Sequence, residues 1–177
     1  IPKEAGEKIT QAAKVDIIDW GKLEKRTSIV GYPILPLVEQ LSEKVEGNFG
    51  QFCHWGATTQ DIMDTADVLQ IRKGLELLSK DLKSISDALE KIVEHHIKTP
   101  MAGRTHLQHA LPISFGYKAS TWLSGIDRHH KRLEEIKKRI FNVSFFGAAG
   151  TLASLGEHDG LKTQSTLAKE LDLNVPD

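Results

Sequence analysis

The stretch VLQIRKGLELLSKDLKSISDALEKI, residues 68–92, decides the fold, because its apolar residues recur at alternating intervals of three and four. This mean period of about 3.5 residues is typical of long helices that pack side by side at a shallow angle. The seam consists of Val68, Ile71, Leu75, Leu78, Leu82, Ile85, Leu89 and Ile92. We expect one helix from about Asp61 to about Lys98, which tolerates Gly74 because one interior glycine costs only about 1 kcal/mol.

A second helical seam lies after Pro112. The same spacing links Ala119, Trp122, Ile126, His129, Leu133, Ile136 and Ile140. We therefore expect a helix that has Pro112 in its first turn, where the missing N–H does no harm, and that ends near Phe141. Acidic and basic residues alternate on its outer face, which favours a solvated, ion-paired surface over a nucleic-acid-binding stripe.

Shorter helical patterns account for most of the remaining chain. They span residues 4–14, 20–28, 34–44 and 161–171. Glycine-rich segments separate them, and no segment alternates convincingly between apolar and polar residues, so we expect few strands. The chain is therefore predicted to be all-α, built around long helices.

The length of the first long helix limits how the chain can fold. A helix of about 36 residues is about 54 Å long, whereas a compact domain of 177 residues is roughly 40 Å across. Such a helix cannot be buried inside its own globule, yet its seam needs apolar partners along its whole length. The sequence thus predicts an obligate homo-oligomer.

Composition excludes several classes of protein. The chain has 23 basic and 24 acidic residues, and this balance argues against a nucleic-acid partner. Its one cysteine, Cys53, excludes an internal disulfide framework and a multi-cysteine zinc site. No apolar run approaches the ~20 residues of a membrane span, and no leader-like segment opens the sequence, so we expect a soluble, cytoplasmic protein. Because the sequence begins without Met and ends without a clear final element, we expect a piece of a longer polypeptide.

Residues that can carry chemistry gather in three polar segments, of which the first is CHWGATTQD, residues 53–61. Thr58 and Asp61 have the spacing of a capping box with Asp in place of Glu. A helix N-terminus with threonine hydroxyls and free N–H groups also binds carboxylates or phosphates. His54 and Gln60 exceed what a cap needs, so a capped helix and an anion site both remain open.

The second polar segment is MAGRTHLQHALP, residues 101–112. Between its two breakers stand Arg104, Thr105, His106, Gln108 and His109. Arg and Thr side chains bind carboxylates, and a histidine moves protons near neutral pH, so the cluster favours a functional segment over a merely structural one. The two histidines have no further ligand at metal-binding spacing, so no metal site is expected.

The third segment is FFGAAGTLASLG, residues 145–156. Its small residues allow the backbone to approach a substrate or another helix closely. It lacks the Gly-Lys-Ser/Thr of a P-loop and does not match a dinucleotide fingerprint. Taken alone, it favours a packing loop.

In this order, and separated by long helices, the three segments resemble the fumarase/aspartase superfamily. HWGATTQDIMDT (54–65) and FGAAGTLASLG (146–156) look most like 3-carboxy-cis,cis-muconate cycloisomerases, whereas a histidine at the position of His106 in GRTHLQHA (103–110) is typical of adenylosuccinate lyases. The resemblance implies that residues 1–50 end an N-terminal helical domain. It implies that residues 51–177 begin the central long-helix bundle domain, with the C-terminal part of the fold lacking.

The resemblance also implies an assembly and a set of site residues. Members of the superfamily are homotetramers whose active sites combine segments from three subunits. The implied general acid is His106, and His54 is a second catalytic candidate or a substrate ligand. The implied substrate-binding residues are Thr58, Thr59, Thr105 and Gln108. The mobile loop with paired serines, which supplies the general base in many members, is not in this sequence.

The implied reaction is proton abstraction next to a carboxylate of a small polycarboxylate, followed by β-elimination or lactonisation, with no metal or organic cofactor. A cycloisomerase and an adenylosuccinate lyase or related C–N lyase are both open. A third possibility of another class is an inactive helical oligomerisation module. The heptads alone fit that module, but it has no need for the polar cluster at residues 104–108.

Overall fold

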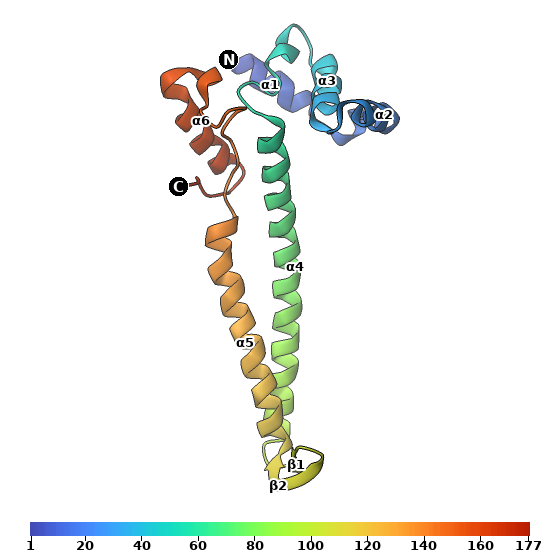
Figure 1. The fold of residues 1–177 in the computed structure, drawn as a ribbon, viewed down its shortest axis with the longest axis vertical. Helices are drawn as coiled ribbons and strands as arrows, with labels where there is room; N and C mark the ends of the chain where they lie inside the picture. The colour runs from blue at the N-terminus through green and yellow to red at the C-terminus, as the bar shows by residue number, and fades with distance from the viewer. The chain divides into compact units, whose positions relative to one another are not determined.

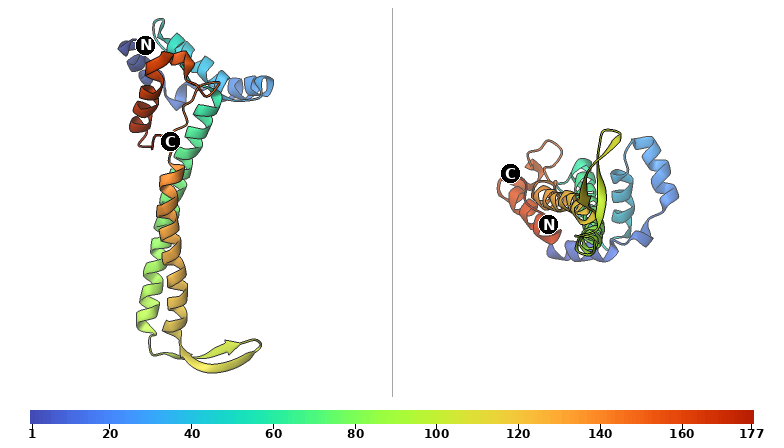
Figure 2. Two further views of the ribbon diagram at one scale, coloured as in Figure 1. Left: turned by 60° about the vertical axis from the view of Figure 1, so that its left-hand side comes forward. Right: turned by 90° about the horizontal axis from the view of Figure 1, so that it is seen from below.

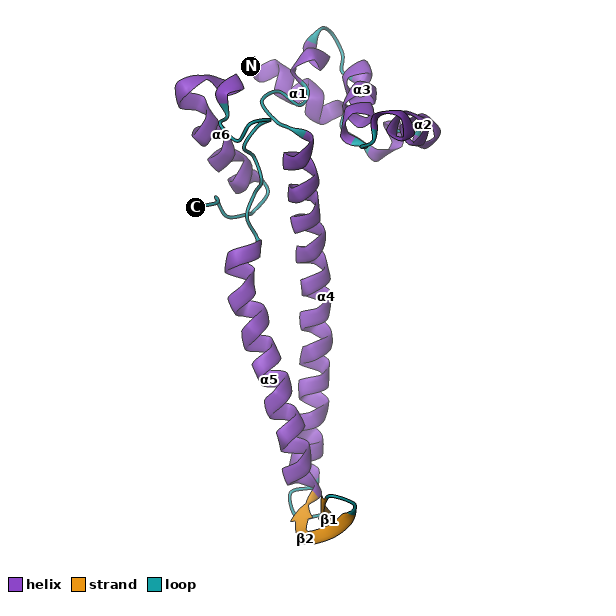
Figure 3. Cartoon of the chain, viewed as in Figure 1, coloured by secondary structure: helices purple, strands orange, loops and turns teal.

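The chain folds as a series of helices interrupted by one two-stranded hairpin. The computed structural model describes the backbone of all 177 residues and the side chains of all except Glu157. The helices are α1 (Lys3–Ala12), α2 (Trp20–Val30), α3 (Ile34–Lys44), α4 (Thr59–His95), α5 (Phe115–Ile140) and α6 (Gly156–Glu170). Short 3₁₀ turns are η1 (Val15–Ile17), η2 (Phe49–Phe52) and η3 (Ala153–Leu155), and the strands are β1 (Pro100–Thr105) and β2 (Gln108–Ser114). The predicted long-helix fold is confirmed, as Figures 1 and 3 show.

Two compact units divide the chain. One unit is Ile1–Asp67 together with Asn142–Asp177, and the other is Val68–Phe141. Helix α4 passes from the first unit into the second. Among the described residues, no helix combines the length and apolar character that a membrane crossing requires.

Helix α4 is continuous over 37 residues and includes Gly74 without a break. It ends at His95, three residues before the predicted end near Lys98. The next residues form a turn in which the Thr99 N–H donates to the His96 carbonyl at 3.1 Å. Pro100 then starts β1, and a proline disfavours helical backbone in the residue before it.

The predicted helix with Pro112 in its first turn is wrong. Pro112 lies in β2, opposite Ala102 of the antiparallel partner β1, and α5 begins only at Phe115. The Ser114 side chain caps α5 by accepting the Tyr117 N–H at 3.1 Å. Residues 101–112 therefore form a hairpin rather than a loop leading directly into a helix.

Two backbone features shape this hairpin. The register shifts between Ala102 and Arg104, and a Cβ on the intervening Gly103 would lie 2.5 Å from the Leu111 carbonyl oxygen. Thr105 pairs with Gln108, so His106 and Leu107 form a two-residue turn. Leu107 has φ +58°, a left-handed conformation that costs a residue with a Cβ about 1 kcal/mol. Figure 2 shows the hairpin bending away from the axes of the two helices that it joins.

Small residues let α5 approach the end of α4 closely. A Cβ on Gly116 would lie 2.8 Å from both the Ile97 Cα and the Val93 carbonyl oxygen. Ala119 is completely buried one turn later. The rings of His96 and Phe115 meet edge to face, with centroids 5.1 Å apart. This contact holds the two helices together at the hairpin end of their unit.

The predicted seam of α4 divides into two stripes. Leu75, Leu82 and Leu89 are half-buried on the stripe that also contains Ser86, which is only 5% exposed. The neighbouring stripe is left uncovered, with 46–47% of the side chain exposed at Ile71, Leu78 and Ile85. The apolar face of α4 is therefore wider than its own chain covers.

The position of the buried histidine in α5 differs from the prediction. His129 was expected in the seam, but it is exposed and its ring Nδ1 lies 3.3 Å from an Arg132 guanidinium nitrogen. His130 is half-buried instead, and among the described residues its buried Nε2 has no hydrogen-bond partner. A straight helix drifts by about 20° per heptad from the 3.5 period, so a residue 11 positions after Ala119 shares its face.

The other unit packs its short helices around a small core. Its fully or nearly buried apolar residues are Ala5, Ile34, Pro36, Val45, Val143, Phe145, Leu152 and Ala168. Arg26 of α2 and Glu39 of α3 form a bidentate ion pair at 3.0 and 3.2 Å. Helix α6 begins at Gly156, earlier than the predicted start at residue 161.

The close approach at Gly116 gives a direct test of this packing. We expect Gly116→Ala to lower the free energy of unfolding by about 1–3 kcal/mol, because the added methyl pushes against backbone that cannot rotate away. Gly125→Ala, in the same helix, is the matched control, since its Cβ would meet only the tip of Arg128 at 3.9 Å. We expect Gly125→Ala to be neutral or stabilising, by up to about 1 kcal/mol. Urea unfolding of the intact protein measures both, and equal effects of the two variants would contradict the packing described.

Candidate active-site segments

The N-terminus of α4 is organised by Asp61, whose side chain is 3% exposed. One carboxylate oxygen accepts the Thr58 N–H at 3.0 Å, as in a capping box. The same oxygen accepts the Gly147 N–H at 3.0 Å, and the other accepts the Phe146 N–H at 2.9 Å. Asp61 therefore joins the first predicted segment to the third, which are 85 residues apart in sequence.

The third segment is a packed loop with buried polar anchors. The Thr65 hydroxyl donates to the Ser144 carbonyl and accepts the Ser144 N–H, each at 3.0 Å. The Gln164 amide donates to the Phe145 carbonyl at 2.9 Å. Gly147, at φ +75°, lies so near Gly56 that a Cβ would be 3.3 Å from the Gly56 carbonyl oxygen. These contacts agree with the interpretation of this segment as a packing loop. The loop lies against the first turns of α4.

His54 lies in the turn before α4 in a left-handed conformation, φ +60°. Its ring is half-buried, and this burial lowers the pKa of His54 below the ordinary 6.5, against a smaller opposing effect of the Asp61 charge. The imidazole is therefore mostly neutral at pH 7. In that form one ring nitrogen donates a hydrogen bond and the other accepts a proton.

The remaining polar residues of the first segment differ in their surroundings. Thr58 and Thr59 are half-buried at the start of α4, within one turn of Asp61. Gln60 is exposed, and its amide donates to the Asp64 carboxylate one turn further on. Because the Gln60 amide already donates to Asp64 in the same helix, an anion site here depends on Thr58, Thr59 and His54.

The second predicted group lies in and beside the hairpin turn. Thr105, His106 and Gln108 are all exposed, and Thr105 and Gln108 face each other across the last pair of the strands. In the described part of the chain, none of these three side chains makes a hydrogen bond. The hairpin thus presents an imidazole flanked by a hydroxyl and an amide to its surroundings.

The structure assigns these groups to different units. His54, Thr58 and Thr59 belong to the unit formed by residues 1–67 and 142–177, whereas Thr105, His106 and Gln108 belong to residues 68–141. Asp61, Thr65 and Gln164 are the polar residues whose anchoring role sequence reasoning missed. The only signal for Asp61 was its capping-box spacing, and that spacing does not reveal its contacts with residues 146 and 147.

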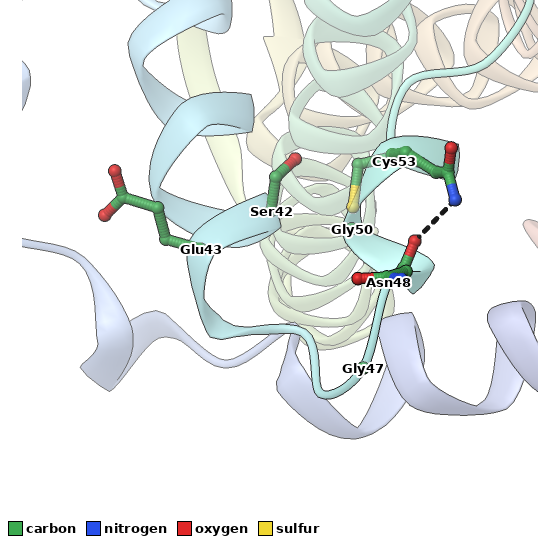
Figure 4. A pocket seen from close by; sticks show the side chains of 7 residues that line it. Ser42, Glu43, Gly47, Asn48, Gly50 and Cys53 are labelled. Carbon is green, nitrogen blue, oxygen red and sulfur yellow. Dashed lines mark hydrogen bonds between the residues drawn. The ribbon is translucent and has the colours of Figure 1, made fainter.

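A hollow of about 680 Å³ lies beside the first segment, between α3 and η2 (Figure 4). Its lining includes Ser42, Glu43, Asn48, Gln51 and the half-buried Cys53. The Gln51 amide donates to the Asn48 carbonyl at 2.8 Å, and Glu43 points away from the other labelled side chains. This lining has a carboxylate and no cation, so it does not suit a carboxylate substrate.

Among the described residues, no three His, Cys, Asp or Glu side chains are grouped to hold a metal ion.

The anchoring role of Asp61 generates a prediction. Asp61→Asn replaces one acceptor oxygen by an NH₂ group that faces a backbone N–H donor, so at least one buried donor loses its partner. We expect a loss of about 1–3 kcal/mol in the free energy of unfolding. Asp64→Asn is the control, because its side chain accepts from the Gln60 amide and Asn keeps an acceptor. We expect it to stay within about 0.5 kcal/mol of the wild type in urea unfolding. A wild-type midpoint for Asp61→Asn would show that the loop does not depend on this carboxylate.

The sequence model of the family described as Lyase matches residues 3–175. Trans-aconitate decarboxylase 1 of Mycosarcoma maydis is 46% identical over 98% of this chain and 35% of its own length. Adenylosuccinate lyase of Methanocaldococcus jannaschii is 38% identical over 98% of this chain and 37% of its own length. For 3-carboxy-cis,cis-muconate cycloisomerase of Pseudomonas aeruginosa, identity is 38% over 100% of this chain and 39% of its own length.

Solved structures agree with the sequence relatives. Fumarate lyase from Mesorhizobium sp. BNC1 has a TM-score of 0.95 and 58% identity, and the match covers 100% of this chain and 41% of that one. The 3-carboxy-cis,cis-muconate lactonizing enzyme from Pseudomonas putida has a TM-score of 0.94 and 36% identity, with the same coverage. The chain thus spans about two fifths of the length of these proteins, from 35% to 41%. The resemblance inferred from the three motifs is confirmed: the chain belongs to the lyase family of the fumarase/aspartase superfamily.

Proposed function

We propose that the protein containing this chain removes a proton next to a carboxylate of a polycarboxylate substrate and completes a β-elimination or a lactonisation. The observation that carries the proposal is the start of α4, where a half-buried His54 with a lowered pKa precedes the half-buried Thr58 and Thr59 by four and five residues in a member of the lyase family. The names of the three relatives contain aconitate, succinate and carboxymuconate, each a compound with at least two carboxylates.

The first segment suits binding of a substrate carboxylate. A helix N-terminus offers N–H groups and a positive dipole end, and the hydroxyls of Thr58 and Thr59 add donors. The buried Asp61 carboxylate opposes this field and already occupies the Thr58 N–H. Binding therefore depends mainly on the hydroxyls and on the neutral His54, which donates one N–H without carrying a charge. The same donors stabilise the extra negative charge that develops when the proton leaves.

The second segment suits proton delivery. We assign the general acid to His106, because an exposed imidazole at a hairpin turn can reach a leaving group and donate a proton to it. Thr105 and Gln108 flank it and hold the departing portion of the substrate. In a lyase the acid protonates a departing nitrogen or oxygen. In a cycloisomerase the departing group is an internal carboxylate, so no fragment leaves.

We favour the cycloisomerase branch, with adenylosuccinate lyase or a related C–N lyase as the alternative. The segments at 54–65 and 146–156 resemble the cycloisomerases, and the 38% identical Pseudomonas aeruginosa enzyme supports that branch. His106 and the equally identical Methanocaldococcus jannaschii enzyme support the C–N branch. We place the general base in the paired-serine loop that is typical of the superfamily. The signature of that loop is not found in residues 1–177.

The proposal includes a homotetramer in which copies of the chain complete each other's sites. Exposed apolar side chains on three elements support it: Ile71, Leu78 and Ile85 on α4, Trp122 and Ile136 on α5, and Leu107 on the hairpin. Exposed apolar area of this extent in one unit is typical of an interface between subunits. A cytoplasmic location remains part of the same proposal.

The role of His106 is tested by substitution in the intact protein. Carboxymuconate and adenylosuccinate are offered as substrates, and we expect turnover of one of them. His106→Gln should lower kcat by a factor on the order of 10² or more, because the leaving group loses its proton donor. His109→Gln, an exposed histidine on β2 of the same hairpin, should keep kcat within about threefold. Full activity of His106→Gln would remove His106 from the mechanism, and no turnover by the wild type would favour the inactive oligomerisation module.

Sharing of sites between copies is tested by mixing two impaired variants. His54→Asn is one partner, since asparagine tolerates the positive φ at this position, and His106→Gln is the other. If each site takes these residues from different subunits, random reassembly restores about one quarter of the sites. We expect activity to appear on mixing after mild dissociation, whereas each variant alone stays low. Mixtures that remain as inactive as their components would place both histidines in one subunit's site.

A further inference from the structure

Leu107 is the residue of the hairpin turn to which the proposed chemistry assigns no role. Its side chain is 93% exposed, and its backbone has φ +58°. Glycine or asparagine suits such a position better, because a Cβ is strained there. In the isolated chain, leucine at this position is therefore unfavourable both in its exposed apolar side chain and in its backbone conformation. This cost indicates that Leu107 contacts a surface outside its own chain.

Leu107 is also coupled to the candidate acid. His106 and Leu107 are the only residues between Thr105 and Gln108, which pair across the strands. A turn this short has little freedom of its own once its closing pair is formed. A surface that buries the Leu107 side chain therefore sets the position of the His106 imidazole as well.

An apolar hollow of suitable size lies in the other unit. Its volume is about 590 Å³, and Trp55, Leu155 and Leu167 contribute apolar lining. Trp55 is 51% exposed although it is large and aromatic. A Cβ on Gly56 would lie 2.7 Å from Leu155, so this hollow is next to the turn that holds His54.

Charge complements shape at these two surfaces. The hairpin, residues 100–114, contains Arg104 and two histidines but no acidic residue. The hollow carries Asp159 and Glu170 against one cation, Lys162. A hairpin turn that inserts a leucine between Trp55 and Leu155 would bring its basic residues to an acidic rim.

We propose that Leu107 of one copy of this chain packs into the hollow lined by Trp55 and Leu155 in a second copy. The contact makes Leu107 a positioning residue, which holds His106 beside His54 of that second copy. The proposal rests on the proposed function for the role of His106. The contact itself is independent of which reaction is catalysed.

Cross-linking tests the contact without an activity assay. In a Cys53→Ser background of the intact protein, Leu107→Cys subunits are mixed with Ser154→Cys subunits, reassembled, and treated with an oxidant or a short bis-maleimide. Ser154 is an exposed lining residue of the hollow. A disulfide requires Cα atoms within about 7 Å, so we expect a covalent heterodimer. Leu111→Cys, on β2 of the same hairpin, is the control and should give little product. No cross-link from position 107, or equal yield from position 111, overturns the proposal.

Kinetics tests the positioning role. We expect Leu107→Gly to lower kcat at least tenfold with a smaller change in KM, although the glycine relieves backbone strain and so does not impair folding. Leu107→Met should restore most of kcat, because methionine also fills an apolar hollow. Leu111→Ala, from a side chain that is 81% exposed, should leave kcat unchanged. Wild-type kcat in Leu107→Gly would reject the positioning role.

Cross-linking from position 107 and turnover of a polycarboxylate can fail independently of each other. A cross-link in a protein that turns over no polycarboxylate supports the contact and rejects the proposed function. Turnover without a cross-link from position 107 supports the function and rejects the contact.

Discussion

The carboxylate of Asp61 is the interaction on which the first unit depends. It accepts three backbone N–H groups, one from the start of its own helix and two from residues 146 and 147. A buried carboxylate is costly unless its oxygens are satisfied, so the loop and the helix cannot separate without exposing it. Thr65 and Gln164 extend this arrangement to residues 144 and 145. As a result, these hydrogen bonds fix the backbone that carries the Thr58 and Thr59 hydroxyls.

The second unit depends on a different constraint, the width of the apolar face of α4. Its own chain supplies one partner helix, α5, and small residues such as Gly116 and Ala119 allow close contact there. The stripe of Ile71, Leu78 and Ile85 stays uncovered. Apolar area left in water opposes folding, and this uncovered stripe is the reason why we propose that further copies of the chain pack against α4.

Much of this arrangement could be predicted from the sequence, and the failures have physical causes. The seam of α4 followed from a period that needs no tertiary information, and Ile34–Lys44 was predicted with its observed bounds. The hairpin was missed because residues 108–114 do not alternate in polarity, and Pro112 in a helix-like context suggested a first turn. His129 was misplaced because a helix without supercoil drifts from the 3.5 period. The contacts of Asp61 with residues 146 and 147 span 85 and 86 positions of sequence, and no local spacing reveals them.

The candidate residues fall into two chemically different environments, and this difference bears on the mechanism. His54 is half-buried with a lowered pKa on an anchored backbone, which suits a neutral hydrogen-bond donor. His106 is exposed on a two-residue turn, so nothing in its own chain fixes its ring. An acid must be held within hydrogen-bond reach of the leaving group to contribute to the rate. If His106 is that acid, its orientation has to come from whatever surface covers the turn. In the proposed homotetramer, contacts between subunits are then a condition for proton transfer as well as for stability.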